Sequence, residues 1–195
     1  MDTACAILAG GRSLRMGRDK ATADFQGRTL IRTIFDIVKT VFEDIIIVSS
    51  MHGPMDGIDA AIVKDIVPIQ TPMAGIATAL LNSRHPRVFV VACDMPFLTR
   101  EAILCLVDAP GNAEITIPMI GQYYEPLHAV YDRSCLPHFL RLIGLNRLKI
   151  SGVFPYVTMR VIKDDPCFRN VRGDLVFLNL NTVEELQCVK ADEPL

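Results

Sequence analysis

Residues 4–20 have the sequence ACAILAGGRSLRMGRDK, in which an uninterrupted apolar run passes directly into a glycine-rich, basic segment. The six apolar residues at positions 4–9 predict a strand buried on both faces, because a half-exposed strand would alternate polar and apolar side chains. A glycine-rich loop after such a strand is typical of open α/β sheets, where ligands bind beyond the carboxyl ends of the strands. This junction therefore predicts both the fold class and the position of a ligand site.

Short apolar runs and segments with helical periodicity alternate along the rest of the chain. Residues 45–48 are four β-branched residues in succession, whereas the apolar residues of 29–42 recur every three or four positions. Further strands are expected at 60–63, 87–92, 115–119, 127–131, 156–162 and 175–178, and further helices at 73–81, from Thr99 onwards, at 134–143 and at 182–189. This order predicts an α/β fold of three layers, with a mainly parallel, Rossmann-like sheet covered by helices on both faces.

The overall composition limits the kind of protein that this chain can be. It has 195 residues, of which 50% are hydrophobic, so we expect one well-packed domain over residues 1–195 and exclude disorder. A formal net charge of −2 argues against a nucleic-acid binder. The longest uncharged stretch, residues 66–83, is interrupted by Pro68 and Pro72, and no membrane-spanning segment is expected.

The N-terminus and the cysteines favour a cytoplasmic protein. The sequence begins without the basic and then apolar pattern of a secretory leader. Its six cysteines are scattered, and none forms a Cys-x-x-Cys pair. We interpret them as small buried apolar residues in a reducing compartment, ahead of disulfides or a zinc site.

The loop after the first strand has the composition of an anion-binding site. Residues 12–20 carry a net charge of +3, because they contain one acidic residue, Asp19, and four basic residues, Arg12, Arg15, Arg18 and Lys20. Glycines let backbone N–H groups approach a phosphate closely. Met16 breaks the spacing of a P-loop, and the adjacent pair at residues 10–11 breaks that of a dinucleotide-binding Gly-x-Gly-x-x-Gly motif. A kinase, GTPase or dehydrogenase is therefore disfavoured, and a solvated surface hairpin remains the alternative.

Residues 8–20 follow the pattern Leu-Ala-Gly-Gly-x-Ser-x-Arg-Met-Gly-x-Asp-Lys. This pattern resembles the signature of the nucleotidyltransferases related to molybdenum cofactor guanylyltransferase, which join the GMP part of GTP to molybdopterin and release pyrophosphate. The resemblance continues at Asp65 and at residues 72–76, 93–96 and 179–182, so that it covers nearly the whole chain. It implies a fold of the nucleotidyltransferase type, with a nucleotide side at about residues 1–110 and an acceptor side at about residues 111–195.

Three residues are candidates for a catalytic role in such a reaction. Nucleotidyl transfer requires that the charge of the triphosphate and of the departing pyrophosphate be neutralised, and Arg15 and Lys20 are placed to do so. Asp94 follows the strand expected at 87–92, level with the loop, and is the candidate ligand of Mg²⁺, the cofactor that we expect. The alternative is that Asp94 only caps the next helix, although Thr99 is the better cap.

The resemblance also implies a nucleotide-binding set at the same end of the sheet. Its members are Leu8, Ala9, Gly10, Gly11, Lys20, Ser49, Asp65 and Asp94. Leu8, Ala9 and Gly10 are implied to contact the base and ribose through main-chain groups. Asp65 is implied to help bind the nucleotide by contacting the guanine or the metal. The alternative is that Asp65 is only a turn residue. Ser49 stands in a loop where the relatives often have Asn, and a serine can still form a hydrogen bond.

The acceptor is implied to bind on the less regular C-terminal side. Asn179 and Asn181 belong to this side by resemblance, and short amides suit the donor and acceptor groups of a pterin; Asn181 is alternatively a helix cap. His128 is a further candidate for the lining of the acceptor pocket. The expected partners are GTP and molybdopterin as substrates and a molybdoenzyme apoprotein or its chaperone as a transient contact, with neither nucleic acid nor membrane.

Two other functions remain as alternatives at this point. A cytidylyltransferase, or another nucleotidyltransferase with a different phosphorylated acceptor, has a similar signature, but Gly10 favours GTP because the cytidylyl relatives tend to have Ala there. A catalytically inactive nucleotide-binding regulator is the second alternative. The presence of Arg15, Lys20 and Asp94 argues against it, since a protein that only binds nucleotide does not need the full set of charges.

Overall fold

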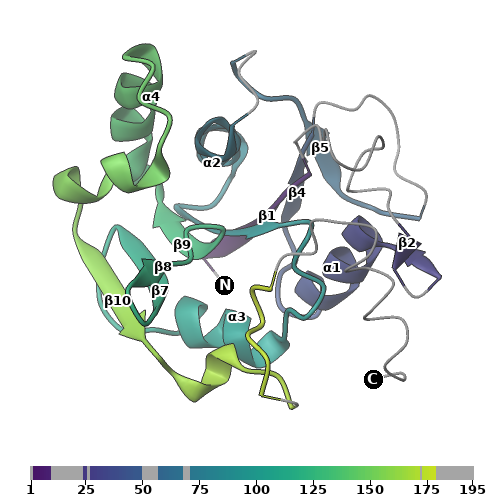
Figure 1. The fold of residues 1–195 in the computed structure, drawn as a ribbon. Helices are drawn as coiled ribbons and strands as arrows, with labels where there is room; N and C mark the ends of the chain where they lie inside the picture. Colours follow the sequence, from purple (N-terminus) through teal and green to yellow (C-terminus); the bar gives the residue numbers. More distant parts are fainter. Residues whose placement is uncertain are drawn as a thin grey trace.

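The computed structural model describes residues 2–9, 24–25, 27–49, 57–67, 71–171 and 173–178 of the chain (Figure 1). The strands are β1 (Thr3–Leu8), β2 (Asp24–Phe25), β3 (Arg28–Thr29), β4 (Ile45–Val48), β5 (Ala61–Val63), β6 (Arg87–Ala92), β7 (Ile115–Ile120), β8 (Tyr123–Tyr124), β9 (His128–Asp132) and β10 (Met159–Lys163). The α-helices are α1 (Leu30–Val38), α2 (Pro72–Asn82), α3 (Arg100–Val107) and α4 (Leu136–Gly144). The 3₁₀ helices are η2 (Arg133–Cys135), η3 (Ile150–Gly152), η4 (Phe154–Tyr156) and η5 (Pro166–Phe168).

A mixed sheet organises these elements, with the strand order β10-β7-β9-β6-β1-β4-β5 and with β8 paired to β7. Strands β6, β1, β4 and β5 are all parallel to one another, and β10 is parallel to β7. Strand β9 runs antiparallel to both of its neighbours, a direction that its apolar pattern does not reveal. The α/β class with a mainly parallel, three-layer arrangement is confirmed, and β9 divides the sheet into two parts.

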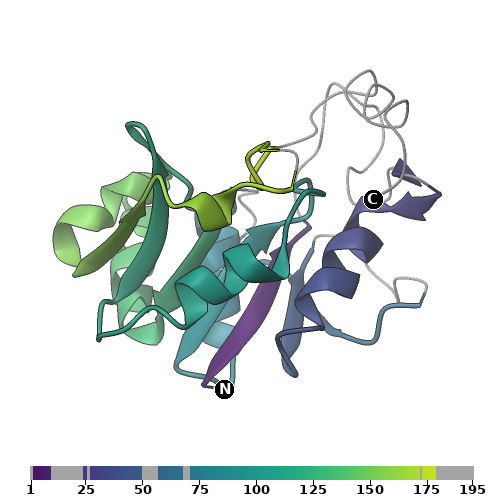
Figure 2. The ribbon, with the colours of Figure 1, turned by 90° about the horizontal axis from the view of Figure 1, so that it is seen from below.

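Helices cover both faces of the sheet, with α1 and α3 on one face and α2 and α4 on the other (Figures 1 and 2). Successive side chains of a strand point to opposite faces, so β1 contributes to both cores. Cys5 and Ile7 belong to the core under α1 and α3, whereas Ala6 and Leu8 belong to the core under α2 and α4. None of the four is more than 8% exposed, which explains why all of them are apolar.

Threonine side chains cap three of the four α-helices found in the described residues. The hydroxyl groups of Thr29, Thr71 and Thr99 each accept a hydrogen bond from the backbone N–H three residues later, at the starts of α1, α2 and α3. The predicted start at Thr99 is thereby confirmed. Helix α1 is shorter than the predicted helix at 29–42, because the N–H groups of Thr40 and Val41 bond to carbonyls three residues earlier and tighten the chain into a turn.

The strand predicted at residues 156–162 starts later than expected. Residues Phe154–Tyr156 form the 3₁₀ helix η4, with Pro155 in its first turn, and β10 begins only at Met159. Proline has no N–H group to donate to a neighbouring strand, so it favours the helical turn over an extension of the sheet.

The strand predicted at residues 175–178 is not formed. Leu175 makes only an isolated bridge with Arg169, and Gly173, with a φ of 85°, turns the chain between them. Val176 and Phe177 are nevertheless buried, at 0% and 5% exposure. The apolar character of this run therefore reflects its packing on the core and not a place in the sheet.

Two further expectations concern the C-terminal helix and the absence of a membrane segment. The helix predicted at residues 182–189 lies outside the described residues. In the part of the chain that the structure describes, no helix combines the length and the apolar character needed to cross a membrane.

The cysteines behave only partly as predicted. Cys5, Cys93 and Cys135 are buried free thiols, which confirms their interpretation as small apolar residues. The same interpretation is wrong for Cys105 and Cys167, which are free thiols of intermediate exposure. These two residues lie on separate elements, α3 and η5, that pack against each other.

Candidate functional site

The carboxyl ends of four adjacent parallel strands meet at one edge of the sheet. Leu8, the last residue of β1, pairs in register with Val48 of β4 on one side and with Ala92 of β6 on the other. Val48 in turn pairs with Val63, the last residue of β5. Figure 2 shows β1 running from the N-terminus towards this edge. The four strands end level with one another, so the residues that follow them share one edge, as the sequence predicts.

Backbone hydrogen bonds extend this alignment by one residue beyond the strands. The Ala9 N–H donates to the Val48 carbonyl at 2.8 Å, and the Ser49 N–H donates to the Val63 carbonyl at 3.0 Å. Ala9 and Ser49 are 2% and 1% exposed. The structure therefore places Ala9 and Ser49 together with Leu8 at the predicted edge, and their contacts with a nucleotide stay predictions.

Asp94 lies in the turn that follows β6, beside the end of β1. The Cys93 N–H donates to the Leu8 carbonyl at 3.2 Å, which brings the start of this turn against β1. Asp94 itself is half-buried. Helix α3 takes its cap from Thr99, whose hydroxyl accepts from the Ala102 N–H at 3.2 Å. The alternative interpretation of Asp94 as the cap of this helix is therefore wrong.

Asp65 follows β5 and is anchored to α2 by a threonine that the sequence analysis does not single out. The Thr78 hydroxyl donates to Asp65 Oδ1 at 3.1 Å and accepts from the Ile66 N–H at 3.1 Å. Thr78 is completely buried. Burial raises the pKa of Asp65, and the hydrogen bond from Thr78 opposes that rise. Thr78 thus fixes the position of this carboxyl group with respect to the helix.

Asp65 and Asp94 follow strands that are not neighbours in the sheet. Their strands, β5 and β6, are separated by β4 and β1 in the sheet. Neighbouring strands are about 4.8 Å apart, so the two strand ends are separated by roughly 14 Å. Carboxylate oxygens that ligate Mg²⁺ lie about 2.1 Å from it. Of the two roles implied for Asp65, the spacing therefore favours contact with the base over contact with the metal of Asp94.

Gly75 allows the first turn of α2 to approach the end of β1. A Cβ atom at this position would lie 3.1 Å and 3.2 Å from the two methyl carbons of Leu8. These distances are shorter than ordinary van der Waals contact between carbon atoms. The glycine inside a helical segment is the sequence signal for this close packing.

His128 begins β9 next to Val91 of β6, so its backbone lies near the same edge. Its side chain is completely buried and packs against three phenyl rings, with ring centroids 5.1 Å from Phe89, 6.3 Å from Phe168 and 5.1 Å from Phe177. Within the described residues, neither ring nitrogen has a hydrogen-bond partner of normal geometry. Burial lowers the pKa of His128 to about 3, against a smaller opposing effect of the Ala102 backbone. Its predicted role towards the acceptor stays a prediction.

Glu125 is a second ionisable group near this edge that the sequence analysis does not single out. Its carbonyl accepts from the His128 N–H at 3.1 Å, and the Leu127 carbonyl accepts from the Ala92 N–H at 3.2 Å, so this loop runs beside the end of β6. Burial raises the pKa of Glu125 to about 6. A lone Glu before a strand carries no recognisable sequence signal for such an environment.

Several predicted site residues lie outside the described residues: Gly10, Gly11, Arg15, Lys20, Asn179 and Asn181. Their roles stay predictions. The described members of the set are Leu8, Ala9, Ser49, Asp65, Asp94 and His128. Leu8 ends β1, the next four follow β1, β4, β5 and β6 at the same edge, and His128 lies on the antiparallel neighbour.

An α/β sheet with four parallel strands that end level at one edge, followed there by two carboxyl groups, has the layout of the Rossmann-like class, in which ligands bind beyond the carboxyl ends of the strands. The model of the MobA-like NTP transferase domain matches residues 5–152. The chain belongs to this family and is a nucleotidyltransferase.

Individual relatives agree with this assignment. The chain is 35% identical over 190 residues to a molybdenum cofactor guanylyltransferase of Desulfosudis oleivorans, covering 95% of this chain and 93% of the relative. It is 33% identical over 185 residues to a probable molybdenum cofactor guanylyltransferase of Clostridium perfringens, covering 93% of each. Its fold is similar to that of the molybdopterin-guanine dinucleotide biosynthesis protein A of Archaeoglobus fulgidus, with a TM-score of 0.81, 24% identity and coverage of 96% of both chains.

Proposed function

We propose that this nucleotidyltransferase transfers GMP from GTP to molybdopterin, with Mg²⁺ as cofactor, and forms molybdopterin guanine dinucleotide and pyrophosphate. The observation that carries the proposal is the 35% identity, over 95% of the chain, to a molybdenum cofactor guanylyltransferase. The signature at residues 8–20 supports it, as does the position of Asp94 at the carboxyl edge of the parallel strands.

The terminal phosphate of molybdopterin attacks the α-phosphorus of GTP, a P–O bond forms, and the bond to the pyrophosphate breaks. The chain needs no covalent intermediate for this exchange. Its contribution is to hold the two phosphates in line and to neutralise the charge that moves onto the pyrophosphate. We assign this neutralisation to Arg15 and Lys20 of the basic loop.

The donor set around Asp94 fits Mg²⁺. This ion prefers oxygen ligands, keeps several waters, and is held by one or two carboxylates together with substrate phosphates. Asp94 offers a half-buried carboxylate in a turn that begins against the end of β1, where the phosphate-binding loop leaves the sheet. When bound there, Mg²⁺ supplies charge neutralisation to the phosphate oxygens.

We assign Asp65 to the guanine end of GTP. The separation of roughly 14 Å from the Asp94 strand suits an extended nucleotide lying across the edge, with its phosphates near β6 and its base near β5. Guanine carries N–H donors on one edge of its ring, where adenine carries a different set of hydrogen-bond donors and acceptors. An ionised carboxylate accepts hydrogen bonds from such N–H donors. Thr78 holds the carboxylate in place for this contact.

The acceptor is assigned to the part of the chain from about residue 111 onwards, with Asn179 and Asn181 as its candidate contacts. His128, which the resemblance implies for the same pocket, has a completely buried side chain and is not assigned a contact. The nucleotide side covers about residues 1–110, and both sides form one domain. We place the reaction in the cytoplasm, where the product passes to a molybdoenzyme apoprotein or its chaperone through a transient contact.

Substrate selection tests this function. The protein is incubated with molybdopterin, Mg²⁺ and each of GTP, CTP, ATP and UTP in turn, and both pyrophosphate and the mass of the dinucleotide product are measured. We expect product with GTP and no pyrophosphate when molybdopterin is left out. Product with CTP and not with GTP would establish a cytidylyltransferase instead. If none of the four nucleotides gave product, a nucleotide-binding regulator would be favoured.

A further inference from the structure

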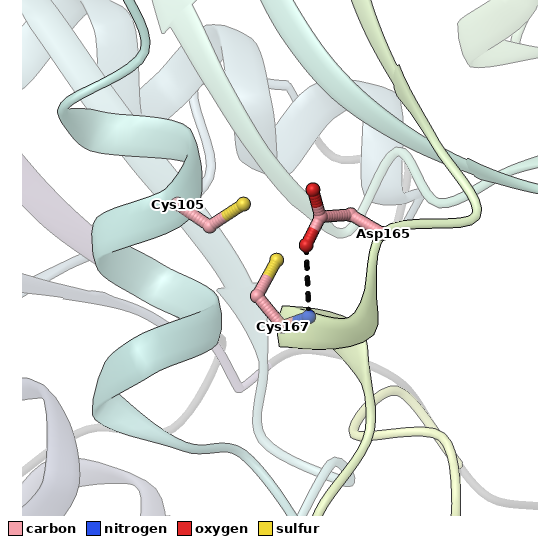
Figure 3. A group of neighbouring side chains, drawn as sticks. All are labelled: Cys105, Asp165 and Cys167. Atoms are coloured by element: carbon pink, nitrogen blue, oxygen red, sulfur yellow. Dashed lines mark hydrogen bonds between the residues drawn. The ribbon is translucent and has the colours of Figure 1, made fainter.

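Cys105, Asp165 and Cys167 form a cluster at the contact between α3 and η5 (Figure 3). Their potential ligand atoms, two sulfurs and a carboxylate oxygen, all lie within 4.8 Å of one another. All three residues are half-buried, so the three side chains are accessible to water and are also held in place by neighbouring residues.

The local structure explains why these side chains converge. Asp165 caps η5, since its Oδ1 accepts from the Cys167 N–H at 2.9 Å, and this bond fixes the carboxylate next to the Cys167 side chain. Phe168, the last residue of η5, is completely buried and holds the turn against the core. Cys105 reaches the same point from the last turn of α3.

The chemistry of the donor set selects one class of ligand. Two thiolates and one carboxylate are a combination that suits Zn²⁺, whereas Mg²⁺ prefers oxygen ligands alone. We propose that Cys105, Asp165 and Cys167 bind a Zn²⁺ ion through two sulfurs and one carboxylate oxygen, with water as the fourth ligand. This site is separate from the one assigned to Mg²⁺ at Asp94 and does not depend on the proposed substrates.

The geometry is compatible with such a site after a small adjustment. With Zn–S bonds of about 2.3 Å and Zn–O bonds of about 2.1 Å, tetrahedral ligands lie roughly 3.5–3.8 Å from one another. Sulfur and oxygen atoms already within 4.8 Å reach these separations by small rotations of the side chains. Asp165 can accept the Cys167 N–H with one oxygen and ligate with the other, an arrangement that orients a metal-binding carboxylate.

Binding follows a simple proton balance and has a structural consequence. The two thiols each release a proton as the Zn–S bonds form, and no oxidant or reductant takes part. The ion would connect α3 to the segment that follows β10, two regions about 60 residues apart in the chain. It would thereby fix the segment that leads to residues 179–181, where the acceptor-binding asparagines are predicted.

Metal titration of the reduced full-length protein tests the proposal. Co²⁺ serves as a spectroscopic probe for the site, because thiolate ligands give it a charge-transfer absorption in the near ultraviolet. We expect this absorption to saturate at about one ion per chain, to be abolished by added Zn²⁺, and to be unaffected by excess Mg²⁺. Zn²⁺ should also raise the Tm and protect Cys105 and Cys167 from alkylation, as located by peptide mass spectrometry.

Substitutions assign the ligands and keep the test independent of folding. Cys105→Ser and Cys167→Ser should each weaken Zn²⁺ binding by more than about 100-fold. The loss of a residue that only orients a ligand typically weakens metal binding by about 10- to 100-fold, so a larger effect identifies a ligand. Asp165→Asn keeps an oxygen for the Cys167 N–H while it removes the charged ligand, and it should weaken binding with little loss of stability. Asp164→Asn, at the neighbouring exposed position, and Cys135→Ser, in the other core, are matched controls that should bind as the wild type does.

Three results would overturn the zinc site. The first is a reduced wild-type protein that gives no thiolate absorption with Co²⁺. The second is an absorption that survives in the folded Cys105→Ser and Cys167→Ser variants. The third is a combination of two observations: Cys105 and Cys167 form a disulfide in air, and the reduced cysteines are alkylated equally with and without Zn²⁺. The two residues would then be a redox-active thiol pair and not metal ligands.

Discussion

The two parts of the sheet present different groups at the same edge. In the parallel part, β6, β1, β4 and β5 end at this edge, and the half-buried residues Asp65 and Asp94 lie two positions beyond the ends of β5 and β6. In the other part, β9 starts at this edge, and its first side chain, His128, is sealed beneath three phenyl rings. The difference teaches that one edge of a mixed sheet can hold half-buried carboxyl groups beyond its parallel strands and a fully buried imidazole at the start of its antiparallel strand.

The largest expected effect concerns the parallel part. Asp94→Ala removes the carboxylate that we assign to Mg²⁺, and we expect kcat for dinucleotide formation to fall by at least about 100-fold, as for the loss of a main electrostatic group. Steady-state kinetics with GTP and molybdopterin measure the change. Asp108→Asn, at an exposed position at the end of α3, is the control and should keep normal turnover. Near-normal turnover in Asp94→Ala would assign the metal to another carboxylate.

The next effect concerns the buried histidine of the antiparallel part. The pKa of His128 is lowered to about 3 in the folded protein, from about 6.5 when unfolded, so its contribution to stability is present above pH 6.5 and is lost as the pH falls towards 3. Between pH 7 and pH 5 this residue alone should lower the free energy of unfolding by about 2 kcal/mol.

The variant His128→Phe isolates this contribution. It replaces the imidazole by a ring that suits the surrounding phenyl groups and cannot gain a proton. Urea unfolding at the two pH values should show a smaller loss of stability than in the wild type. An equal loss in both proteins would mean that His128 exchanges protons freely and reaches solvent, which would weaken the contrast between the two parts.

A smaller effect should separate base recognition from catalysis. Thr78→Val removes the hydroxyl that orients Asp65. One hydrogen bond contributes about 1 kcal/mol, so we expect KM for GTP to rise about 5- to 10-fold while kcat changes little. Thr116→Val, a change of the same kind at a buried position on β7, should leave KM unchanged. A fall in kcat without a change in KM would place Asp65 with the reacting phosphates.

The smallest effect tests Glu125, which lies between the two parts. Its pKa is raised by burial to about 6, so the folded protein favours the protonated carboxyl group, and the stability that this provides below about pH 4.5 is lost as the pH rises through 6. Glu125→Gln should therefore stabilise the protein at pH 7, by about 1 kcal/mol or less because the group is partly screened by solvent.

Thermal unfolding at pH 4 and pH 7 measures this change. The gain should appear at pH 7 and be absent at pH 4, where the wild-type side chain is already neutral. The matched variant Glu43→Gln, at an exposed position before β4, should change the stability by less than about 0.5 kcal/mol at either pH. A gain of equal size at both values would indicate a packing effect and not a titration.

Local patterns predict much of the fold. The β-branched run at 45–48 and the apolar run at 87–92 are strands with the predicted bounds, and Thr99 is the predicted cap. These features depend on neighbouring residues, which is why sequence reasoning finds them. The direction of β9 depends on which strands it pairs with, and no pattern within the strand encodes that choice.

The same distinction applies to the site. The position of Asp94 is predictable because this residue follows a recognisable strand, and the structure confirms its place in the turn after β6 at the edge. The contact between Asp65 and Thr78 joins a loop to a helix 13 residues away, and the cluster of Cys105 and Cys167 joins segments that share no motif. Such pairings arise only when distant elements pack, so the single sequence does not reveal them.

Hydrogen exchange on addition of GTP and Mg²⁺, without molybdopterin, tests the central claim that the parallel edge alone binds the nucleotide. Amide protons in residues 8–9, 48–49, 63–67 and 92–98 should become more protected, because these segments follow the four parallel strands. Residues 123–132, which include Glu125 and His128, should exchange as in the free protein. Protection of residues 123–132 without protection of the four strand ends would contradict the account.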